Sequence, residues 1–448
     1  MAARGPTPLS VQWTSRIHQI RLSRKAKSSS VGVVALLRAN GMTANQEIDA
    51  DGTAVRGLVK RWPCRMMSRS RQLTLLSPLE NARLAARFPG TAIHLLRDCV
   101  AGSGATSFPR RIGLFLTNRC NFACAMCAVQ NVRDEGLAHG GDLPFEFLEK
   151  IFAECRPYQP VADLLGGEPL LYRQLGDAVK LACRRNVLGV VTTNGLKLKE
   201  RAEELVDANL PVLQVSLDGW DEPSQTERGL VKGSFERLCE GVRAVQQARG
   251  KRPFPMIRVL TAVTRVNHAH LDRIQSVVAG LGVRSWGVSN YFYLNRNAHQ
   301  RHQAFALVNG LSGSVAAHAI PEDVYLTPPQ VQDLKSSLQR VQELNRRLRL
   351  RIAYSWNIDI DAYYSTRQAA RSSLCDLPYT RMDFHTDGHM AVCVSGKRVG
   401  QVGRDSIAEI WRGRPMADYR AMYERTRPMP MCFRCCGLSQ TIKFDAQS

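Results

Sequence analysis

The 448-residue chain is long enough for two or three domains, and its 44% hydrophobic content can bury a full core. No run of residues approaches the roughly 18 apolar side chains that span a membrane, so we expect no membrane-spanning segment. The net charge of +22 is uneven, because residues 1–111 carry 18 Lys and Arg against 5 Asp and Glu. The charge is therefore weak evidence for a nucleic-acid partner of the remaining chain.

The first 105 residues read as a basic extension. Residues 1–70 lack an apolar period, mix Arg, Ser, Gly and Thr, and contain no acidic residue before Glu47. This composition suits a disordered tail, a transit-like presequence, or translation upstream of a later start at Met66 or Met67. A nucleic-acid-binding arm is a further interpretation, although aromatic residues that could stack on bases are few. We expect residues 1–65 to be dispensable.

From residue 106 to 325, short β-branched runs alternate with amphipathic segments. The runs are 112–117, 161–167, 187–195, 212–219, 256–265 and 285–293. Apolar strands that alternate with helices predict a parallel sheet covered by helices, here a partial (β/α)6 TIM-type barrel of the α/β class. The polar endings TNRC, GGEP, TTNG and SLDG mark the carboxyl ends of strands, where such folds place active sites.

The pattern changes after residue 293. Residues 294–325 look irregular and rich in His and Asn, and residues 329–349 predict a helix with a solvated, charged face. Residues 326–448 then predict a linker helix and a small, cysteine-containing α+β domain with a hairpin.

The stretch TNRCNFACAMC places three cysteines on one loop after the first predicted strand. Cys120, Cys124 and Cys127 have the C-x3-C-x2-C spacing that can hold a cubic [4Fe-4S] cluster through three thiolates, which leaves one iron open. A closed structural zinc site would need a fourth ligand, and the nearest candidate is His139. The missing ligand favours a cluster whose open iron binds a substrate or cofactor.

This loop and the strand endings after it resemble the radical S-adenosylmethionine (SAM) superfamily over residues 111–293. The resemblance implies that the open iron chelates SAM, and that an electron from the cluster cleaves SAM to a 5′-deoxyadenosyl radical, which abstracts hydrogen from the substrate. It implies cofactor contacts from Gly166, Gly167, Glu168, Thr193, Asn194, Ser216, Asp218 and Arg228. Arg228 would pair with the SAM carboxylate, and the segment VTRVN (263–267) would lie near the adenine. Met126 stands where many members have an aromatic residue, and it can also pack against adenine.

Four further cysteines recur near the end of the sequence. They are Cys375, Cys393, Cys432 and Cys435. The first two bracket a predicted hairpin with its turn at Asp387-Gly388, and the pattern resembles the SPASM/twitch extension of radical SAM enzymes. No cysteine follows Cys436, so the shortened twitch form with one auxiliary [4Fe-4S] cluster fits better than the full SPASM form. A four-thiolate zinc site is the alternative, and Cys436 could replace Cys435 as the fourth ligand.

An auxiliary cluster with four thiolate ligands has no open iron, so the resemblance implies that it accepts an electron from a substrate radical. We expect oxidation of a peptide, as in peptide maturation, or dehydrogenation of a small-molecule alcohol, with flavodoxin or ferredoxin as the reductant. The alternatives are a radical RNA-modifying enzyme and a non-catalytic iron–sulfur electron carrier.

Two further expectations concern the catalytic base and the compartment. No base can be named, because Asp383, His385, Asp387 and His389 have positions typical of turns or the surface. The 13 cysteines suggest metal binding in a reducing cytoplasm.

Overall fold

The computed structural model describes residues 78–94, 106–124, 127, 141–229, 231–290, 296–311, 326–354, 360–364, 375–393 and 397–435. All of them belong to one compact unit, Ser70–Ser448. The predicted dispensable segment 1–65 lies outside these ranges, as do Met126, His139 and Cys436. Among the described helices, none has both the length and the apolar character needed to cross a bilayer.

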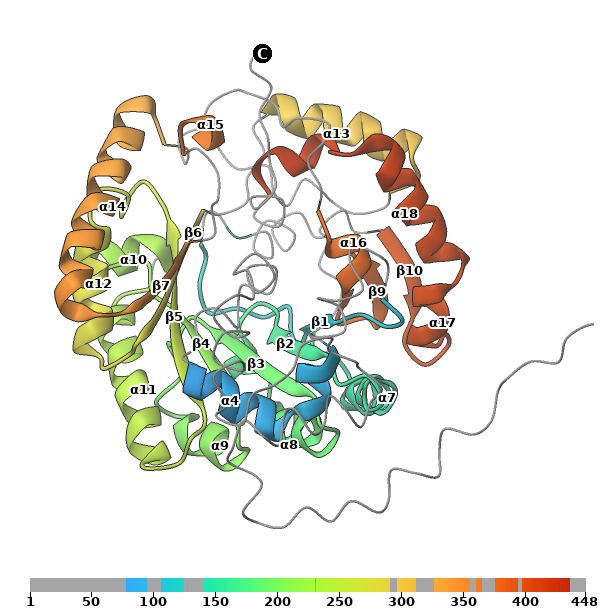
Figure 1. Cartoon of the computed structure of the whole chain (residues 1–448), viewed down its shortest axis with the longest axis horizontal. Coiled ribbons are helices and arrows are strands. Elements are labelled where there is room, and N and C mark those ends of the chain that lie inside the picture. Colours follow the sequence, from blue (N-terminus) through green and yellow to red (C-terminus); the bar gives the residue numbers. More distant parts are fainter. Residues whose placement is uncertain are drawn as a thin grey trace, which may run out of the picture. The chain divides into compact units, whose positions relative to one another are not determined.

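The described strands form one ten-stranded sheet that curves, with helices on its outer side (Figure 1). Its order is β10-β9-β8-β1-β2-β3-β4-β5-β6-β7. The strands are β1 (Arg111–Phe115), β2 (Val161–Leu165), β3 (Leu188–Thr193), β4 (Val212–Ser216), β5 (Met256–Val263), β6 (Ser285–Asn290), β7 (Arg351–Tyr354), β8 (Arg381–Phe384), β9 (His389–Val392) and β10 (Lys397–Gln401). Neighbours from β1 to β7 are parallel, β8 is parallel to β1, and β9 is antiparallel to both β8 and β10.

The six predicted runs form β1 to β6, and the partial α/β barrel is confirmed. The predicted hairpin is confirmed as β8 and β9, and Gly388 supplies the positive φ of +80° that its turn requires. The pairing of β8 with β1 was not predicted, because a parallel partner so far along the chain leaves no local signal. The hairpin therefore extends the barrel sheet itself.

Helices connect the strands and cover the outer face (Figure 1). They are α4 (Pro78–Arg87), α7 (Phe145–Cys155), η3 (Pro169–Leu171), α8 (Leu175–Arg184), α9 (Ala202–Asp207), α10 (Glu222–Gly229), α11 (Ser234–Arg249), α12 (Leu271–Gly280), α13 (Arg296–Val308), α14 (Pro328–Leu348), α15 (Ile360–Tyr364), α16 (Leu377–Thr380), α17 (Ile407–Arg412), α18 (Arg414–Thr426) and η6 (Pro430–Arg434), where η marks a 3-10 helix. The irregular structure expected over 294–325 is wrong for α13. Its inward positions include Ala298, His302 and Ala306, which give only a weak apolar period.

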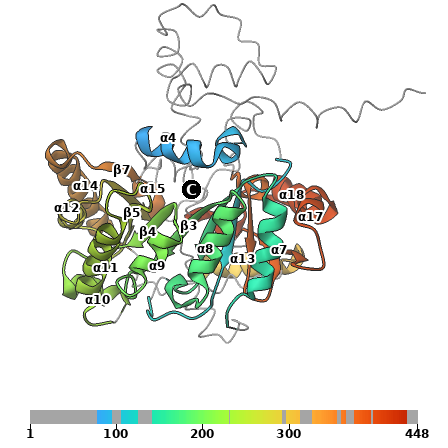
Figure 2. The same cartoon turned by 90° about the horizontal axis from the view of Figure 1, so that it is seen from below.

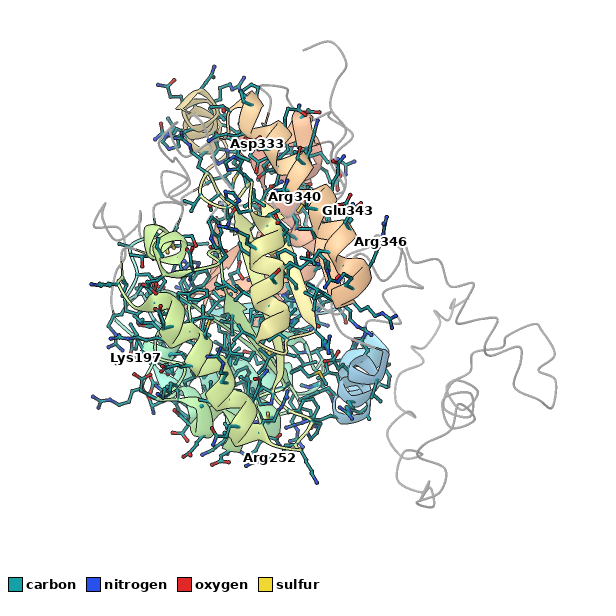
Figure 3. All side chains as sticks on the ribbon, turned by 90° about the vertical axis from the view of Figure 1, so that its left-hand side faces the viewer. Lys197, Arg252, Asp333, Arg340, Glu343 and Arg346 are labelled. Atoms are coloured by element: carbon teal, nitrogen blue, oxygen red, sulfur yellow. The ribbon has the colours of Figure 1, made fainter. Side chains whose placement is uncertain are left out.

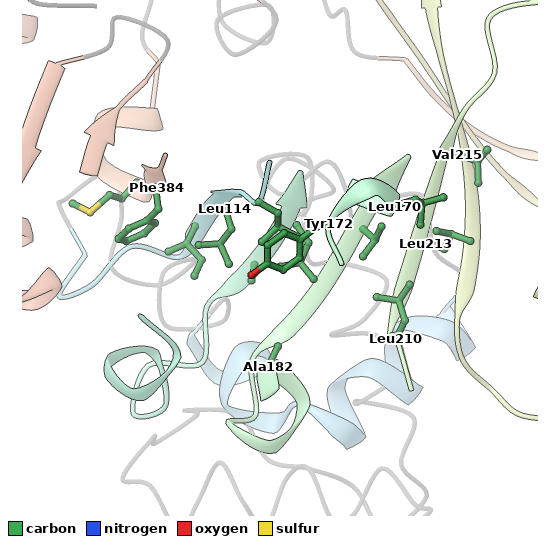
Figure 4. Packing of buried hydrophobic residues seen from close by; sticks show 14 of the residues in the cluster. Leu114, Leu170, Tyr172, Ala182, Leu210, Leu213, Val215 and Phe384 are labelled. Carbon is green, nitrogen blue, oxygen red and sulfur yellow. The ribbon is translucent and has the colours of Figure 1, made fainter. Parts of the chain in front are cut away.

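Alternation along the strands separates the two faces of the sheet. Ile112, Leu114 and Phe384 are fully buried in the core between the sheet and the helices, part of which Figure 4 shows. Successive side chains of a strand point to opposite faces, so Arg111 and Gly113 face the inside of the curve. The inner face is thus available for polar side chains.

Helix α4 packs across the amino ends of the barrel strands. Its Leu84 and the following Phe88 join a separate buried cluster with Val161, Leu188, Val190, Val212, Phe254 and Met256. Figure 2 shows α4 lying across one end of the sheet. Residues 78–88, which lie inside the expected basic extension, are therefore a structural part of the barrel.

The predicted helix over 329–349 is confirmed as α14. Asp333, Arg340, Glu343 and Arg346 are all exposed, and Figure 3 shows their side chains on the outside of the molecule. The charged face is solvated, as expected, while the apolar face packs on α12.

Candidate active site

Cys120, Cys124 and Cys127, the first cysteine loop, come together at the carboxyl end of β1. All three belong to one small apolar cluster with Phe122, Leu196 and Val231. A backbone hydrogen bond of 3.0 Å from Cys127 N to Cys124 O closes the turn. The three cysteines thus lie in one cluster at this strand end, and their role as cluster ligands stays a prediction.

The GGEP loop packs directly on the backbone of the first cysteine loop. Gly167 N donates to Thr117 O at 2.7 Å, and Glu168 N donates to Arg119 O at 2.8 Å. A Cβ atom on Gly166 would lie 2.4 Å from Thr117 O, and one on Gly167 would lie 2.2 Å from Arg119 O. The two glycines are thus required for contact between the loops, whether or not they also contact a ligand.

Glu168 joins the ends of the second and third strands. Its side chain is 1% exposed, and its carboxylate accepts hydrogen bonds from Leu170 N at 3.0 Å, Thr193 Oγ1 at 2.6 Å and Asn194 N at 2.8 Å. Asn194 in turn donates from Nδ2 to Asn121 Oδ1 at 2.8 Å, which reaches the first cysteine loop. This chain of contacts fixes three strand ends relative to one another.

The SLDG ending of β4 is fixed to the end of β5. Ser216 is the last residue of β4, and the buried Asp218 accepts a hydrogen bond from Ala262 N at 2.7 Å. Asn267, in the predicted adenine-side segment, donates to Asp218 O and Ala262 O at 2.8 Å each. Arg228 lies in α10, but its side chain is outside the described part, so its predicted contact with SAM stays a prediction.

Cys375, Cys393, Cys432 and Cys435 form the C-terminal cysteine group. Three of the four side chains are buried, and Cys393 follows β9 with a positive φ of +58°. Burial, and then the neighbouring Cys393 thiol, raises the pKa of both Cys375 and Cys432 well above the usual range. Cys393 therefore lies close enough to act on both thiols, and a bound cation or cluster would relieve this repulsion.

The donor sets fit the groups that the sequence predicts. Three thiols beside a glycine-rich loop suit a cluster with one open iron, and four thiols, three of them buried, suit a fully ligated cluster. Within the described ranges, no three His, Cys, Asp or Glu side chains are arranged as the ligands of a metal ion. The choice of a cluster over zinc therefore follows from the sequence pattern.

The two groups of cysteines lie at opposite ends of one strand pair. The first cysteine loop follows the carboxyl end of β1. Cys375 precedes β8, which is parallel to β1, and Cys393 follows the antiparallel β9, so both come to the amino ends. The inner face of β1 and β8 therefore runs between them.

This inner face carries ion pairs that the sequence did not reveal. Arg111 pairs with Asp163, Arg381 pairs with Asp163 at 2.8 Å, and Arg381 pairs with Asp383 at 2.8 Å. We call these four residues the inner ion-pair network. Burial would raise the pKa of Asp163, but Arg111 and Arg381 together lower it below its ordinary value. Arg258 lies close by at 1% exposure, and burial lowers its pKa to about 9.

A stack of rings continues the inner face toward the first cysteine loop. Phe115, the last residue of β1, stacks on His385 at 4.6 Å between ring centroids, and His385 stacks on His389 at 4.2 Å. Burial, and then His389, lowers the pKa of His385 to about 4. Asn118 Nδ2 also donates to Thr386 Oγ1 at 2.9 Å, which ties the hairpin to the start of the loop.

The roles expected for the hairpin residues are only partly correct. Asp387 is exposed at the turn, as predicted. Asp383 is buried in the inner ion-pair network, and His385 is stacked inside the sheet, so a surface role is wrong for both. The error has a physical cause: the parallel pairing with β1 turns these side chains inward.

The family of the chain follows from two matches. Residues 114–275 match the radical SAM superfamily, and residues 375–436 match SPASM, an iron–sulfur cluster-binding domain. The chain therefore contains a radical SAM domain and a SPASM domain. The second range covers the whole C-terminal cysteine group.

The curated relatives that resemble this chain match only part of it. The chain is 32% identical to a probable GTP 3′,8-cyclase of Methanocella arvoryzae over 179 residues, 39% of this chain and 55% of that protein. It is also 32% identical to a GTP 3′,8-cyclase of Aeromonas hydrophila over 152 residues, 32% of this chain and 44% of that protein. The chain therefore spans about half the length of the curated relatives it matches.

A solved structure shares the fold over more of the chain. SuiB of Streptococcus suis, bound to the precursor peptide SuiA, has a TM-score of 0.53 and 15% identity, and the match covers 91% of this chain and 82% of that chain. The native anSMEcpe structure with bound AdoMet has a TM-score of 0.50 and 13% identity, covering 74% and 91%. At these identities the likeness describes the fold.

Proposed function

We propose that the chain is a radical SAM enzyme that oxidises a peptide or a small-molecule alcohol. The observation that carries the proposal is the connected edge formed by the first cysteine loop, the GGEP loop and the TTNG loop, joined through Glu168. Three thiols at such an edge would hold a [4Fe-4S] cluster with an open iron. When bound with SAM, this cluster supplies the electron that cleaves SAM to the 5′-deoxyadenosyl radical.

The residues of this edge bind and orient SAM in the proposed reaction. The two glycines keep the loop backbones in contact, and Glu168 and Asn194 hold the third strand end against the first cysteine loop. Arg228 pairs with the SAM carboxylate. A rigid edge of this kind lowers the entropy cost of bringing SAM and substrate together.

The C-terminal cysteine group would hold an auxiliary [4Fe-4S] cluster. With four thiolate ligands, such a cluster supplies an electron acceptor rather than a binding site for substrate. The overall change is then a two-electron oxidation: the substrate loses one hydrogen atom to the 5′-deoxyadenosyl radical, and afterwards one electron and one proton. A flavodoxin or ferredoxin supplies the electron that SAM cleavage consumes.

The substrate would lie along the inner face between the two cysteine groups. The Phe115–His385–His389 stack and the inner ion-pair network border this region. The SuiB structure contains a precursor peptide, and a peptide is one of the two substrate classes that we propose here. The other class, a small-molecule alcohol, would need the same removal of hydrogen and of an electron.

Anaerobic reconstitution tests this function. We expect about eight irons per chain, and about four after Cys120, Cys124 and Cys127 are all replaced by Ala, as two cubic clusters require. SAM should bind the parent protein and be cleaved with dithionite, whereas an electron carrier would not bind SAM. Tightly bound zinc in place of the second four irons would overturn the auxiliary cluster. A requirement for RNA in SAM cleavage would favour the RNA-modifying alternative.

A further inference from the structure

Helix α13 buries a histidine that has no visible task. Its inward face carries Ala298, His302 and Ala306, spaced one helical turn apart. His302 is 0% exposed, and neither of its ring nitrogens has a hydrogen-bond partner within the described ranges. Within the described ranges, its ring contacts the ring of Phe305, with the centroids 5.6 Å apart.

An unpartnered buried imidazole needs an explanation. Buried polar groups in native proteins nearly always have partners, because desolvation without a hydrogen bond is costly. A purely apolar contact would be made better by leucine, which needs no partner. The orphaned nitrogens therefore point to a polar group that binds beside them.

The neighbouring element indicates what that group is. Among the described elements, α13 packs most closely on η6, which contains Cys432 and ends next to Cys435. Lys397 of β10 also donates to Gly310 O at 2.8 Å, which fixes the end of α13 near the hairpin. In Figure 1, α13 lies beside the C-terminal helices. The helix that buries His302 is thus part of the wall around the C-terminal cysteine group.

The protonation state limits what His302 can do. Burial, and then the nearby His299, lowers the pKa of His302 to about 4. A neutral imidazole offers one N–H donor and one acceptor nitrogen. The sulfur atoms of a bound iron–sulfur cluster accept hydrogen bonds, and such bonds help to set its reduction potential.

We propose that His302 donates an N–H hydrogen bond to a sulfur atom of the auxiliary cluster held by the C-terminal cysteine group. The inference rests on the proposed function, because it needs that cluster. His302 acts as a positioning residue. Its hydrogen bond stabilises the reduced, more negatively charged cluster, and so raises the reduction potential and makes the cluster a better electron acceptor.

The test uses full-length protein in which Cys120, Cys124 and Cys127 are all replaced by Ala, so that only the auxiliary cluster remains. In this background His302→Leu removes the donor, and His302→Gln keeps an N–H of similar reach. An anaerobic redox titration followed by electron paramagnetic resonance gives the midpoint potential. We expect a more negative potential for Leu and a potential close to the parent for Gln. His299→Leu, one turn away and only partly buried, is the matched control and should leave the potential unchanged.

The other outcomes of the redox titration overturn the proposal. An unchanged potential in His302→Leu means that no bond is made, and equal shifts in Leu and Gln mean that His302 matters only for packing. If His302→Leu does not fold, pulsed resonance on the unsubstituted His302 background with ¹⁵N-labelled histidine decides. A weak histidine ¹⁵N coupling together with an exchangeable proton supports the bond. No coupling, or the strong coupling of a directly ligated nitrogen, overturns it.

Failure of the proposed function would look different. If the protein with Cys120, Cys124 and Cys127 replaced by Ala contains no iron, the chain has no auxiliary cluster and the proposed electron acceptor is wrong.

Discussion

Replacement of Glu168 by Gln separates a structural role from a direct role in SAM binding. The carboxylate is buried and accepts three hydrogen bonds, two on Oε1 and one on Oε2. Gln has the same shape, but its amide nitrogen must replace one oxygen and would then face a donor. If it faces Asn194 N, that buried donor loses its partner at a cost of about 1–3 kcal/mol, and the remaining bonds lose their charge assistance.

We therefore expect Glu168→Gln to lower the free energy of unfolding by roughly 2–4 kcal/mol. Anaerobic denaturant titration of iron-loaded protein measures this change, and equilibrium dialysis measures SAM affinity in parallel. Because the loops loosen, SAM affinity should fall together with stability. Glu204→Gln is the matched control: its carboxylate accepts from Gly176 N at 2.9 Å and from Arg201 Nη2 at 2.8 Å, but the side chain is 34% exposed, so water can replace the lost contacts.

Two results would refute this reasoning. If stability is unchanged while SAM binding is lost, Glu168 contacts SAM directly and the hydrogen bonds to the TTNG loop are incidental. If neither quantity changes, other contacts hold the strand ends together. A loss in the Glu204 variant as large as in the Glu168 variant would show that burial does not set the cost.

Four further predictions test other parts of the chain. Arg228→Ala should weaken SAM binding about tenfold or more at unchanged iron content, because a charge-assisted bond contributes roughly 1.5–3 kcal/mol; unaltered affinity would remove Arg228 from the site. Joint replacement of Cys375 and Cys393 by Ala should halve the iron and leave dithionite-driven formation of 5′-deoxyadenosine, and loss of that activity in folded protein would contradict separate roles for the clusters. The pKa of His385, about 4 when folded, lies below its ordinary value of roughly 6.5. Stability should thus fall as the pH drops from about 6.5 toward 4, by on the order of 1–2 kcal/mol at pH 5. His385→Phe, which keeps the ring stack, should show less of this loss in melting curves at pH 7 and 5, and equal losses would refute it. A chain that begins at Met66 retains α4 and should fold and cleave SAM at the full-length rate; an insoluble product would show that residues 1–65 contribute structure.

The parallel core of the fold was predictable because its signal is local. Runs such as LGVVTT and VLQVS are apolar and β-branched, which favours buried strands and gives a signal within a few residues. The same holds for the first cysteine loop, whose three thiols are close in sequence and come together within one turn. Patterns that neighbouring residues make by themselves are visible without a structure.

The features that were missed depend on long-range pairing. Asp163 and Asp383 both lie beside Gly113 in the register of the sheet, so their ion pairs exist only once β2, β1 and β8 have paired. His302 is similar, because its burial depends on the element that packs against α13. A polar residue in an amphipathic helix reads as exposed until its neighbours are known. We expected Gly166 and Gly167 to contact the cofactor, but their closest neighbours are backbone atoms of the loop that follows β1. That contact also depends on the pairing of distant segments.

The parallel hydrogen bonds between β8 and β1 have a consequence for electron transfer. Electron transfer through protein slows steeply with distance, so a hinge between two domains would let its rate vary with every opening. Here a single sheet joins the elements that carry both cysteine groups, so the hydrogen bonds between β8 and β1 restrict how far the two groups can move apart. A slip of one residue would also turn the inner side chains outward, which opposes any gradual change. Loops at the ends of the strands can therefore vary in length and sequence while the paired strands keep the two cysteine groups in a set arrangement.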